Sequence, residues 1–190
     1  MASSGRRAAG VLESEEIALL EQVALHDRAA FDRLYRRYYR RLARFLEHMV
    51  RSPHLVEEIV NDTMFVVWNG AARFNRASRV STWIFGIAYK TALRALRRAG
   101  RILECDEDYD VALSDATPES ELAVQQRRER IRHALKTLSW EQRAVVELTY
   151  YHGCPYQEIA EILDCPVDTV KTRMFHARRK LKPLLGQEAE

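Results

Sequence analysis

Apolar residues recur at spacings of three and four along most of the chain, which is the pattern of amphipathic helices. Three such stripes run over residues 31–49, 55–68 and 81–98, and glycine is scarce, with 7 residues. No alternating pattern typical of strands persists. We therefore predict an all-α domain over residues 25–101, preceded by an N-terminal extension, residues 1–24, to which the pattern gives no role.

Local residues mark the ends of these helices. Ser52 followed by Pro53 is typical of a helix start, with a capping hydroxyl and a proline at the first helical position. The pair Asn69-Gly70 favours a break, and the polar, basic run 73–80 favours a loop. The third helix is expected to bury one apolar face, made of Trp83, Ile84, Ile87, Ala88, Leu93 and Leu96.

A second small helical domain is predicted over residues 118–186, after a flexible acidic linker at residues 102–117. The linker has neither a helical period nor much apolar content. Thr117-Pro118 then gives the signature of a new helix start. The fold class is therefore all-α, with two small helical domains in sequence.

The end of the chain has the layout of a helix-turn-helix. Two predicted helices, 156–163 and 167–182, are separated by a turn at 164–166, and the helix before them opens with a capping box of Ser139 and Gln142. In such modules the second helix enters the major groove, where Arg and Lys pair with guanine and Thr and Phe contact thymine methyls. The face expected to contact duplex DNA comprises Thr169, Lys171, Thr172, Arg173, Phe175, His176, Arg178 and Arg179.

Other interpretations of this face stay open. A helical hairpin with a solvated basic surface is the alternative, because basic residues near a helix C-terminus also suit the helix dipole. Within the DNA-binding interpretation, Arg178, Arg179 and Lys180 are expected to contact phosphates, which position the protein without specifying sequence. For His176 a surface position without a particular role is equally open.

Charge is distributed unevenly along the chain, although the formal net charge is only +3. Residues 25–101 carry 16 basic against 6 acidic residues, and residues 102–124 carry 8 acidic residues and no Lys or Arg. From residue 125 onward there are 12 basic and 9 acidic residues. Two basic blocks separated by an acidic strip indicate two polyanion-binding domains.

Several classes of protein are disfavoured. No apolar run approaches the roughly 20 residues that span a bilayer, and no apolar stretch follows Arg6 and Arg7 as in a secretory signal, so we expect no membrane insertion. Cys105, Cys154 and Cys165 form no paired motif, which argues against a zinc site or a disulfide framework and favours a reducing cytoplasm. We expect no metal and no cofactor. Clustered carboxylates, a phosphate-binding glycine loop and a Ser-His-Asp set are lacking, so an enzyme is not expected.

The chain resembles the extracytoplasmic-function sigma factors, a group of the sigma-70 family of RNA polymerase subunits. Residues 138–143, together with 156–161 and 169–173, resemble sigma region 4. Residues 31–45 resemble the opening helix of region 2, 56–68 its polymerase-docking helix, and 74–98 its promoter-melting segment. The resemblance covers residues 25–185 and places both domains in the family's order.

The resemblance implies partners and site residues. Family members bind core RNA polymerase, with region 2 on a coiled-coil of the β′ subunit and region 4 on the β flap, and an anti-sigma factor commonly holds them inactive. The docking surface then comprises Glu57, Glu58, Asp62, Phe65 and Trp68, since acidic residues on a basic domain suit a basic partner. A solvated surface position is the alternative for Glu57.

The resemblance also indicates which residues recognise the −10 promoter element. Family members extrude a base from the promoter into a pocket before the third helix, and base capture needs cations for phosphates and amide or hydroxyl groups for base edges. Trp83 is expected to anchor its helix rather than to stack on a base. The expected −10 residues are Arg73, Phe74, Asn75, Arg76, Ala77, Ser78, Arg79, Trp83 and Lys90.

Four positions depart from the family pattern and put the promoter preference in doubt. Lys90 stands where Asn is usual, Asp168 where Gly is usual, and His176 where Arg is frequent. Pro155 replaces a capping Ser or Thr, so we expect Cys154 to be a weak N-cap, with proline at the first helical position.

The function hypothesis is a promoter-specificity subunit of RNA polymerase, which recognises DNA and leaves the chemistry to polymerase. A stand-alone helix-turn-helix regulator is the main alternative, although it leaves the first domain without a role. A basic protein-interaction module is a further alternative. The acidic linker is expected to follow basic polymerase channels, an expectation that rests on its charge alone.

Overall fold

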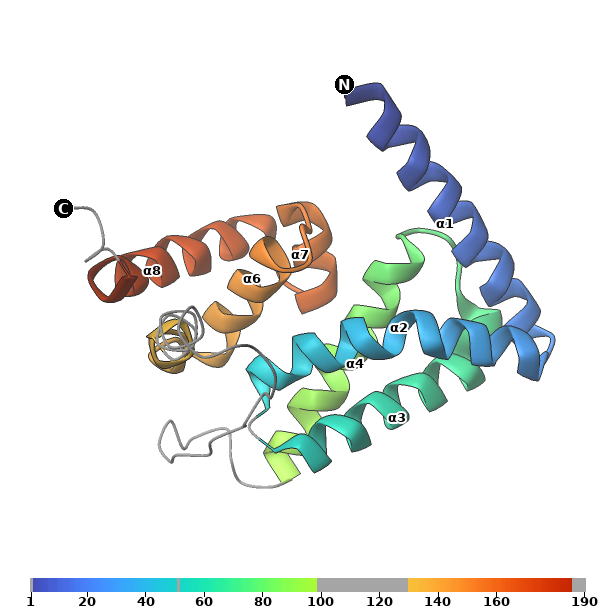
Figure 1. The fold of residues 1–190 in the computed structure, drawn as a ribbon, viewed down its shortest axis with the longest axis horizontal. Coiled ribbons are helices and arrows are strands. Elements are labelled where there is room, and N and C mark those ends of the chain that lie inside the picture. The colour runs from blue at the N-terminus through green and yellow to red at the C-terminus, as the bar shows by residue number, and fades with distance from the viewer. Residues whose placement is uncertain (1, 51, 99–129, 186–190) are drawn as a thin grey trace, which may run out of the picture.

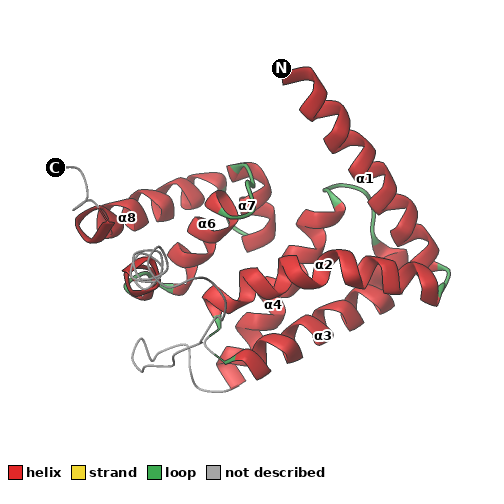
Figure 2. Ribbon diagram, viewed as in Figure 1, coloured by secondary structure: helices red, strands yellow, loops and turns green. Residues whose placement is uncertain are grey.

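The computed structural model describes residues 2–50, 52–98 and 130–185, and every regular element in these ranges is a helix (Figures 1 and 2). The first domain consists of α1 (Ala2–Ala24), α2 (Arg28–Met49), α3 (Pro53–Gly70), the short 3-10 helix η1 (Ala71–Arg73) and α4 (Val80–Arg98). The second contains a helical turn at residues 130–136, then α6 (Trp140–Tyr150), α7 (Tyr156–Leu163) and α8 (Val167–Leu185). The predicted linker and the helix start at Thr117-Pro118 lie outside the described residues.

The caps of the first domain follow from the sequence. The Asp27 carboxylate accepts hydrogen bonds from the backbone N–H groups of Ala29 and Ala30, at 2.8 and 3.1 Å, and so begins α2. Ser52 caps α3 with Pro53 in the first turn, which confirms the predicted helix start.

The N-terminal extension is an integral part of the first domain. Leu20 and Val23 of α1 are buried in the same core as the apolar face of α2. The Tyr38 hydroxyl donates to the Glu16 carboxylate at 2.8 Å in the interior, and burial together with that carboxylate raises the pKa of Tyr38. Helix α1 is therefore fixed to α2 by both apolar packing and a buried hydrogen bond.

The core of α4 differs in part from the predicted one. Ile84, Ala88 and Leu96 are buried as expected, but Trp83, Ile87 and Leu93 are only half-buried. Phe85 and Tyr89, which were not part of the predicted apolar face, are buried instead. The reason is that the second domain packs against that side of α4: Phe85 contacts the His152 ring, and Tyr89 stacks on Trp140 at a centroid distance of 6.1 Å.

The second domain contains the predicted helix-turn-helix. Ser139 and Gln142 form the expected capping box at the start of α6. Asp164 ends α7 in the left-handed conformation, with φ of 53°, which turns the chain toward α8. The expectation for Pro155 was wrong: it occupies the N-cap position itself, without a side-chain hydrogen bond, and α7 begins at Tyr156.

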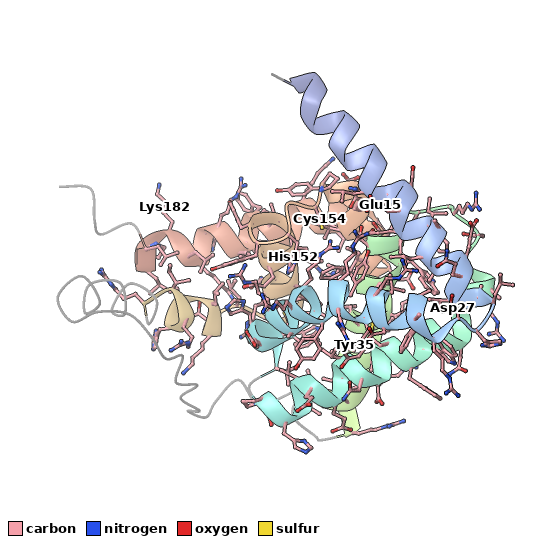
Figure 3. The ribbon with its side chains drawn as sticks, turned by 45° about the vertical axis from the view of Figure 1, so that its right-hand side comes forward. Glu15, Asp27, Tyr35, His152, Cys154 and Lys182 are labelled. Atoms are coloured by element: carbon pink, nitrogen blue, oxygen red, sulfur yellow. The ribbon has the colours of Figure 1, made fainter. Side chains whose placement is uncertain are left out.

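The two domains pack directly on each other, mainly α4 on α7 and α2 on α6 (Figure 1). His152 lies at this junction, with its ring 6.0 Å from Phe45 and 4.8 Å from Phe85 (Figure 3). Helices α4 and α7 approach closely at Gly86, where an added Cβ would lie 3.7 Å from the carbonyl oxygen of Ile162. We call this arrangement the closed conformation.

No helix among the described residues is long and apolar enough to cross a membrane. Within the same residues, no group of three or more His, Cys, Asp or Glu side chains is placed to hold a metal ion. Burial raises the pKa of the Cys154 thiol to about 11, so this cysteine stays in the less reactive protonated form.

Candidate nucleic-acid interface

Helix α8 turns one face inward and leaves the other to solvent. Its buried residues, Val170, Met174 and Ala177, recur at spacings of four and three and pack on α6 and α7. Most of the side chains expected to contact DNA are exposed, and Phe175 is 62% exposed. Thr169 and Arg173 are only half-buried at the edge of this face. An exposed aromatic ring among basic side chains on a helix-turn-helix suits contact with a DNA groove.

The N-terminal turn of α8 carries an ion pair where base contacts are expected. The Lys171 ammonium lies 2.9 Å from the Asp168 carboxylate, and the Thr172 hydroxyl donates to the Asp168 carbonyl at 2.9 Å. The Asp168 side chain is 89% exposed. A carboxylate here suits the helix dipole but repels phosphate. Its favourable contact in DNA is therefore a hydrogen-bond donor on the edge of a nucleobase.

A shallow cleft separates the start of α6 from the start of α8. Its lining combines residues at the start of α6 with residues from the first turns of α8, namely Ser139, Glu141, Gln142, Asp168, Thr169, Thr172, Arg173 and His176. Farther along α8, Arg178 donates to the Tyr150 hydroxyl at 3.2 Å and Lys180 to the Thr137 carbonyl at 3.3 Å. These two cations are held beside the reading face, as phosphate contacts require.

The loop between η1 and α4 makes several local contacts, and we call residues 74–79 the −10 loop because they include most of the expected −10 residues. Phe74 packs on Trp83 with ring centroids 5.3 Å apart, so Trp83 anchors this loop. The Asn75 side chain accepts from the backbone N–H of Ala77 at 3.0 Å, which closes a tight turn. Arg76 adopts the left-handed conformation, with φ of 58°. Arg73 is exposed immediately before the loop, and Ser78 is half-buried within it.

The cations of this region are bound by carboxylates from other elements. Arg76 pairs with Glu21 of α1, and Arg79 lies 3.2 Å from Glu13 of α1. Arg79 also lies 3.2 Å from Glu158 of α7. Guanidinium groups bind carboxylates and phosphates with similar geometry, so Arg76 and Arg79 are also suited to bind phosphate oxygens.

Two of the expected −10 residues contact the second domain in the closed conformation. Glu158 binds Arg79 and also accepts from the Thr82 hydroxyl at 3.4 Å. Lys90 lies 3.0 Å from Asp164 in the turn of the helix-turn-helix. Glu13, Glu21, Glu158 and Asp164 are not predictable from the sequence, because their pairing depends on tertiary packing and no local pattern marks them.

The expected polymerase-docking residues gather along α3. Glu57, Glu58, Asp62 and Phe65 are exposed, and Phe65 is 67% exposed. A large aromatic side chain so exposed beside acids is typical of a protein-binding surface. Trp68 differs from the other four residues.

Trp68 is half-buried and packs on two rings of the domain itself, at centroid distances of 5.0 Å from Phe31 and 5.4 Å from His26. Trp68 therefore packs against the domain itself, behind the exposed residues of the expected docking surface. Beside this surface, Tyr35 of α2 donates to Asn61 of α3 at 2.8 Å and stacks on Tyr39.

Two family models match the chain: Sigma-70 region 2 over residues 34–102, and Sigma-70, region 4 over residues 128–181. The chain is 32% identical to the ECF RNA polymerase sigma-E factor of Haemophilus influenzae, over 88% of the chain and 96% of the relative. It is 33% identical to the ECF RNA polymerase sigma factor SigM of Mycobacterium tuberculosis, over 92% of the chain and 86% of the relative.

Solved structures share the fold. The complex of CnrH with the cytosolic domain of CnrY matches with a TM-score of 0.69 at 23% identity, over 92% of the chain and 99% of its counterpart. The sigma factor RpoE of Bartonella quintana, solved with the anti-sigma factor NepR, matches with a TM-score of 0.67 at 25% identity, over 84% and 98%. The helical architecture described above is therefore shared with these solved structures.

Proposed function

The chain belongs to the extracytoplasmic-function sigma factors, which direct promoter-specific initiation by RNA polymerase, and on that premise we propose a role for each of its surfaces. Residues 25–101 act as region 2, residues 102–117 as the linker, and residues 118–186 as region 4. Helix α8 reads the −35 element in the major groove, and the −10 loop with Trp83 and Lys90 reads the −10 element. The chain supplies recognition and no catalysis, and it works in the cytoplasm with polymerase.

The −35 role rests on the exposed face of α8. Its first two turns present Lys171, Thr172 and Phe175, which suit base edges and thymine methyls. Arg178 and Arg179 follow on the solvent side and suit phosphates. Duplex reading by this helix needs no movement within the helix-turn-helix, because the inward residues already fix α8 on α6 and α7.

The observation that carries the −10 role is the set of carboxylates around Arg79. One guanidinium binds Glu13 and Glu158 at once, each at 3.2 Å, on a loop whose tip, residues 75–77, is exposed. A site that holds two carboxylates in the free protein suits the phosphates of a single strand. The neighbouring amide and hydroxyl groups of Asn75 and Ser78 suit the edge of an extruded base.

The closed conformation is proposed to be the free form of the protein. Glu158 and Asp164 bind Arg79 and Lys90, so the second domain covers cations that the −10 strand needs. Binding of the α3 surface to the β′ coiled-coil and of region 4 to the β flap separates the domains and frees both cations. The two separated domains of one chain can then contact the −35 and −10 elements at the same time.

An anti-sigma factor is proposed as the regulatory partner. Two structures of the same fold contain a bound partner: the cytosolic domain of CnrY on CnrH, and the anti-sigma factor NepR on RpoE. In this chain the exposed aromatic and acidic residues of α3, including Phe65 and Asp62, form the surface that such a partner would cover to block polymerase.

In vitro transcription tests the proposal. Core polymerase purified from the source organism is supplied with the chain and a genomic promoter library, and transcript starts are mapped with and without the chain. We expect a small set of chain-dependent start sites that share two spaced elements. Tight binding of the chain alone to duplex DNA, with no new start sites and no binding to core, would instead support the stand-alone regulator.

A further inference from the structure

Helix α1 contacts the −10 loop along its length, although the sequence pattern gives it no role. In Figure 1 the connection from η1 to α4 runs beside α1. Glu21 pairs with Arg76 near one end of the loop, and Glu13 pairs with Arg79 at the other. Two carboxylates on one helix thus hold the two arginines of the loop.

Glu13 makes two different bonds with its two carboxylate oxygens. One oxygen accepts from the backbone N–H of Val80 at 2.9 Å, which caps the first turn of α4. The other accepts from Nε of Arg79 at 3.2 Å. The side chain is only 21% exposed, so water competes weakly for either bond. One side chain therefore fixes both the start of α4 and the direction of the Arg79 guanidinium.

The two acids on Arg79 differ in what happens when the domains separate. Glu158 belongs to the second domain and leaves with it. Glu13 stays, because α1 is anchored in the first domain by the buried residues Leu20 and Val23. Arg79 uses Nε for Glu13 and a terminal nitrogen for Glu158. Separation of the two domains therefore frees the terminal nitrogen of Arg79, while Glu13 still binds its Nε.

We propose that Glu13 is a positioning residue for −10 recognition, which holds Arg79 and the start of α4 so that the freed edge of the guanidinium meets a phosphate of the captured strand. The inference rests on the proposed function, because it assigns Arg79 to DNA. Glu13 itself does not touch DNA. Its effect passes through Arg79, and holding the guanidinium in place reduces the ordering cost of strand binding.

Glu13→Gln tests the proposal, because the amide oxygen still accepts from Val80 while the ion pair to Arg79 is lost. Glu15→Gln is the matched control. Glu15 lies on the same helix (Figure 3) and pairs with Arg37 at 3.0 Å, away from the loop. Glu13→Ala is the second variant and removes the cap as well. Each protein is assembled with core polymerase.

Two affinities are then measured for each holoenzyme. The first is for a fluorescent single strand covering the −10 element of a promoter selected in the transcription assay, with a scrambled strand as reference. The second is the affinity of the chain for core polymerase. We expect Glu13→Gln to lower the affinity for the −10 strand about tenfold, as loss of one charge-assisted contact predicts, and to leave core binding unchanged. Glu15→Gln should leave both affinities unchanged.

A double-mutant cycle with Arg79→Gln shows whether Glu13 acts through Arg79. We expect Glu13→Gln to have no further effect on strand affinity once Arg79 is replaced. Wild-type strand affinity in Glu13→Gln would overturn the inference alone, and so would full additivity in the cycle. An equal loss of core binding would assign Glu13 a merely structural role. If the wild-type holoenzyme does not prefer the −10 strand, the proposed function fails as well.

Discussion

His48 and Glu147 form a hydrogen-bonded pair across the domain junction, with Nδ1 of His48 3.0 Å from a carboxylate oxygen of Glu147. Glu147 is wholly buried, whereas the His48 side chain is 32% exposed. Arg143 of α6 also donates to the His48 carbonyl, at 3.4 Å. A buried carboxylate of the second domain thus depends on an imidazole of the first for one of its bonds.

Replacing His48 should therefore open the closed conformation. In His48→Ala the Glu147 carboxylate loses its bond while it stays buried, which costs about 1.5–3 kcal/mol and favours separation of the domains. The distance between fluorophores placed on α3 and α8 should lengthen. Arg36→Ala, which removes an exposed ion pair with Asp32 on the outer side of α2, is the control and should change nothing. An unchanged distance in His48→Ala would contradict the role of this pair.

Domain closure should weaken in acid because of His152. Burial, followed by the nearby charges of Arg41, Arg44 and His48, lowers the pKa of His152 from 6.5 to about 4. The closed conformation holds His152 neutral, whereas the open conformation lets it take up a proton at its ordinary pKa. Closure is therefore unaffected above pH 6.5 and is lost progressively as the pH falls toward 4.

The fluorophore distance measured against pH checks this. The ratio of closed to open protein should fall by at most about tenfold per pH unit in that window. His152→Phe keeps a ring against Phe45 and Phe85 without a titrating group, so its pH dependence should be weaker. The same pH profile in both proteins would show that other groups drive the opening.

Removing Glu158 should make the −10 loop more available in the free protein. Glu158→Gln deletes a carboxylate that competes with phosphate for Arg79, and exposed or half-exposed ion pairs contribute up to about 1 kcal/mol, so strand affinity should rise by up to about fivefold. Anisotropy of a labelled −10 strand with the free chain measures this. Glu161→Gln, on an exposed face of the same helix, is the control. A decrease in affinity would contradict competition.

The start of α8 should set the −35 preference. Asp168→Gly and His176→Arg introduce the residues that the family resemblance leads us to expect at these positions, and each is expected to change base preference by about 1–3 kcal/mol at one position. Selection of holoenzyme-bound sequences from a pool randomised at the −35 element measures the change. Arg178→Ala should instead weaken binding to all sequences evenly. An unchanged preference in the first two variants would remove Asp168 and His176 from the reading face.

Local sequence patterns predict the helices and much of the second domain because caps and apolar periods act over a few residues. The cap at Ser52 and the capping box at Ser139 are examples. Burial of Phe85 and Tyr89 could not be predicted in this way. Their environment comes from the other domain, and no pattern within α4 encodes which domain will cover it.

The site residues divide in the same manner. The positions of the −10 loop and of α8 follow from motifs, and the structure leaves most of them exposed. The carboxylates that hold the loop come from α1 and α7, and their pairing depends on how these helices pack. Charge counts placed a basic excess in residues 25–101 but could not show that Arg76, Arg79 and Lys90 are bound to acids in the free protein.

Photo-crosslinking within the initiating complex tests the two-point reading of promoters most directly. The photoreactive amino acid p-benzoylphenylalanine replaces either Phe175 of α8 or Asn75 of the −10 loop, both of which are exposed. The holoenzyme is irradiated on a promoter labelled on each strand, and the crosslinked bases are mapped. We predict that position 175 crosslinks only the −35 duplex and position 75 only the non-template strand at the −10 element. Crosslinks from both positions to the same element, or none that depend on core polymerase, would contradict the account.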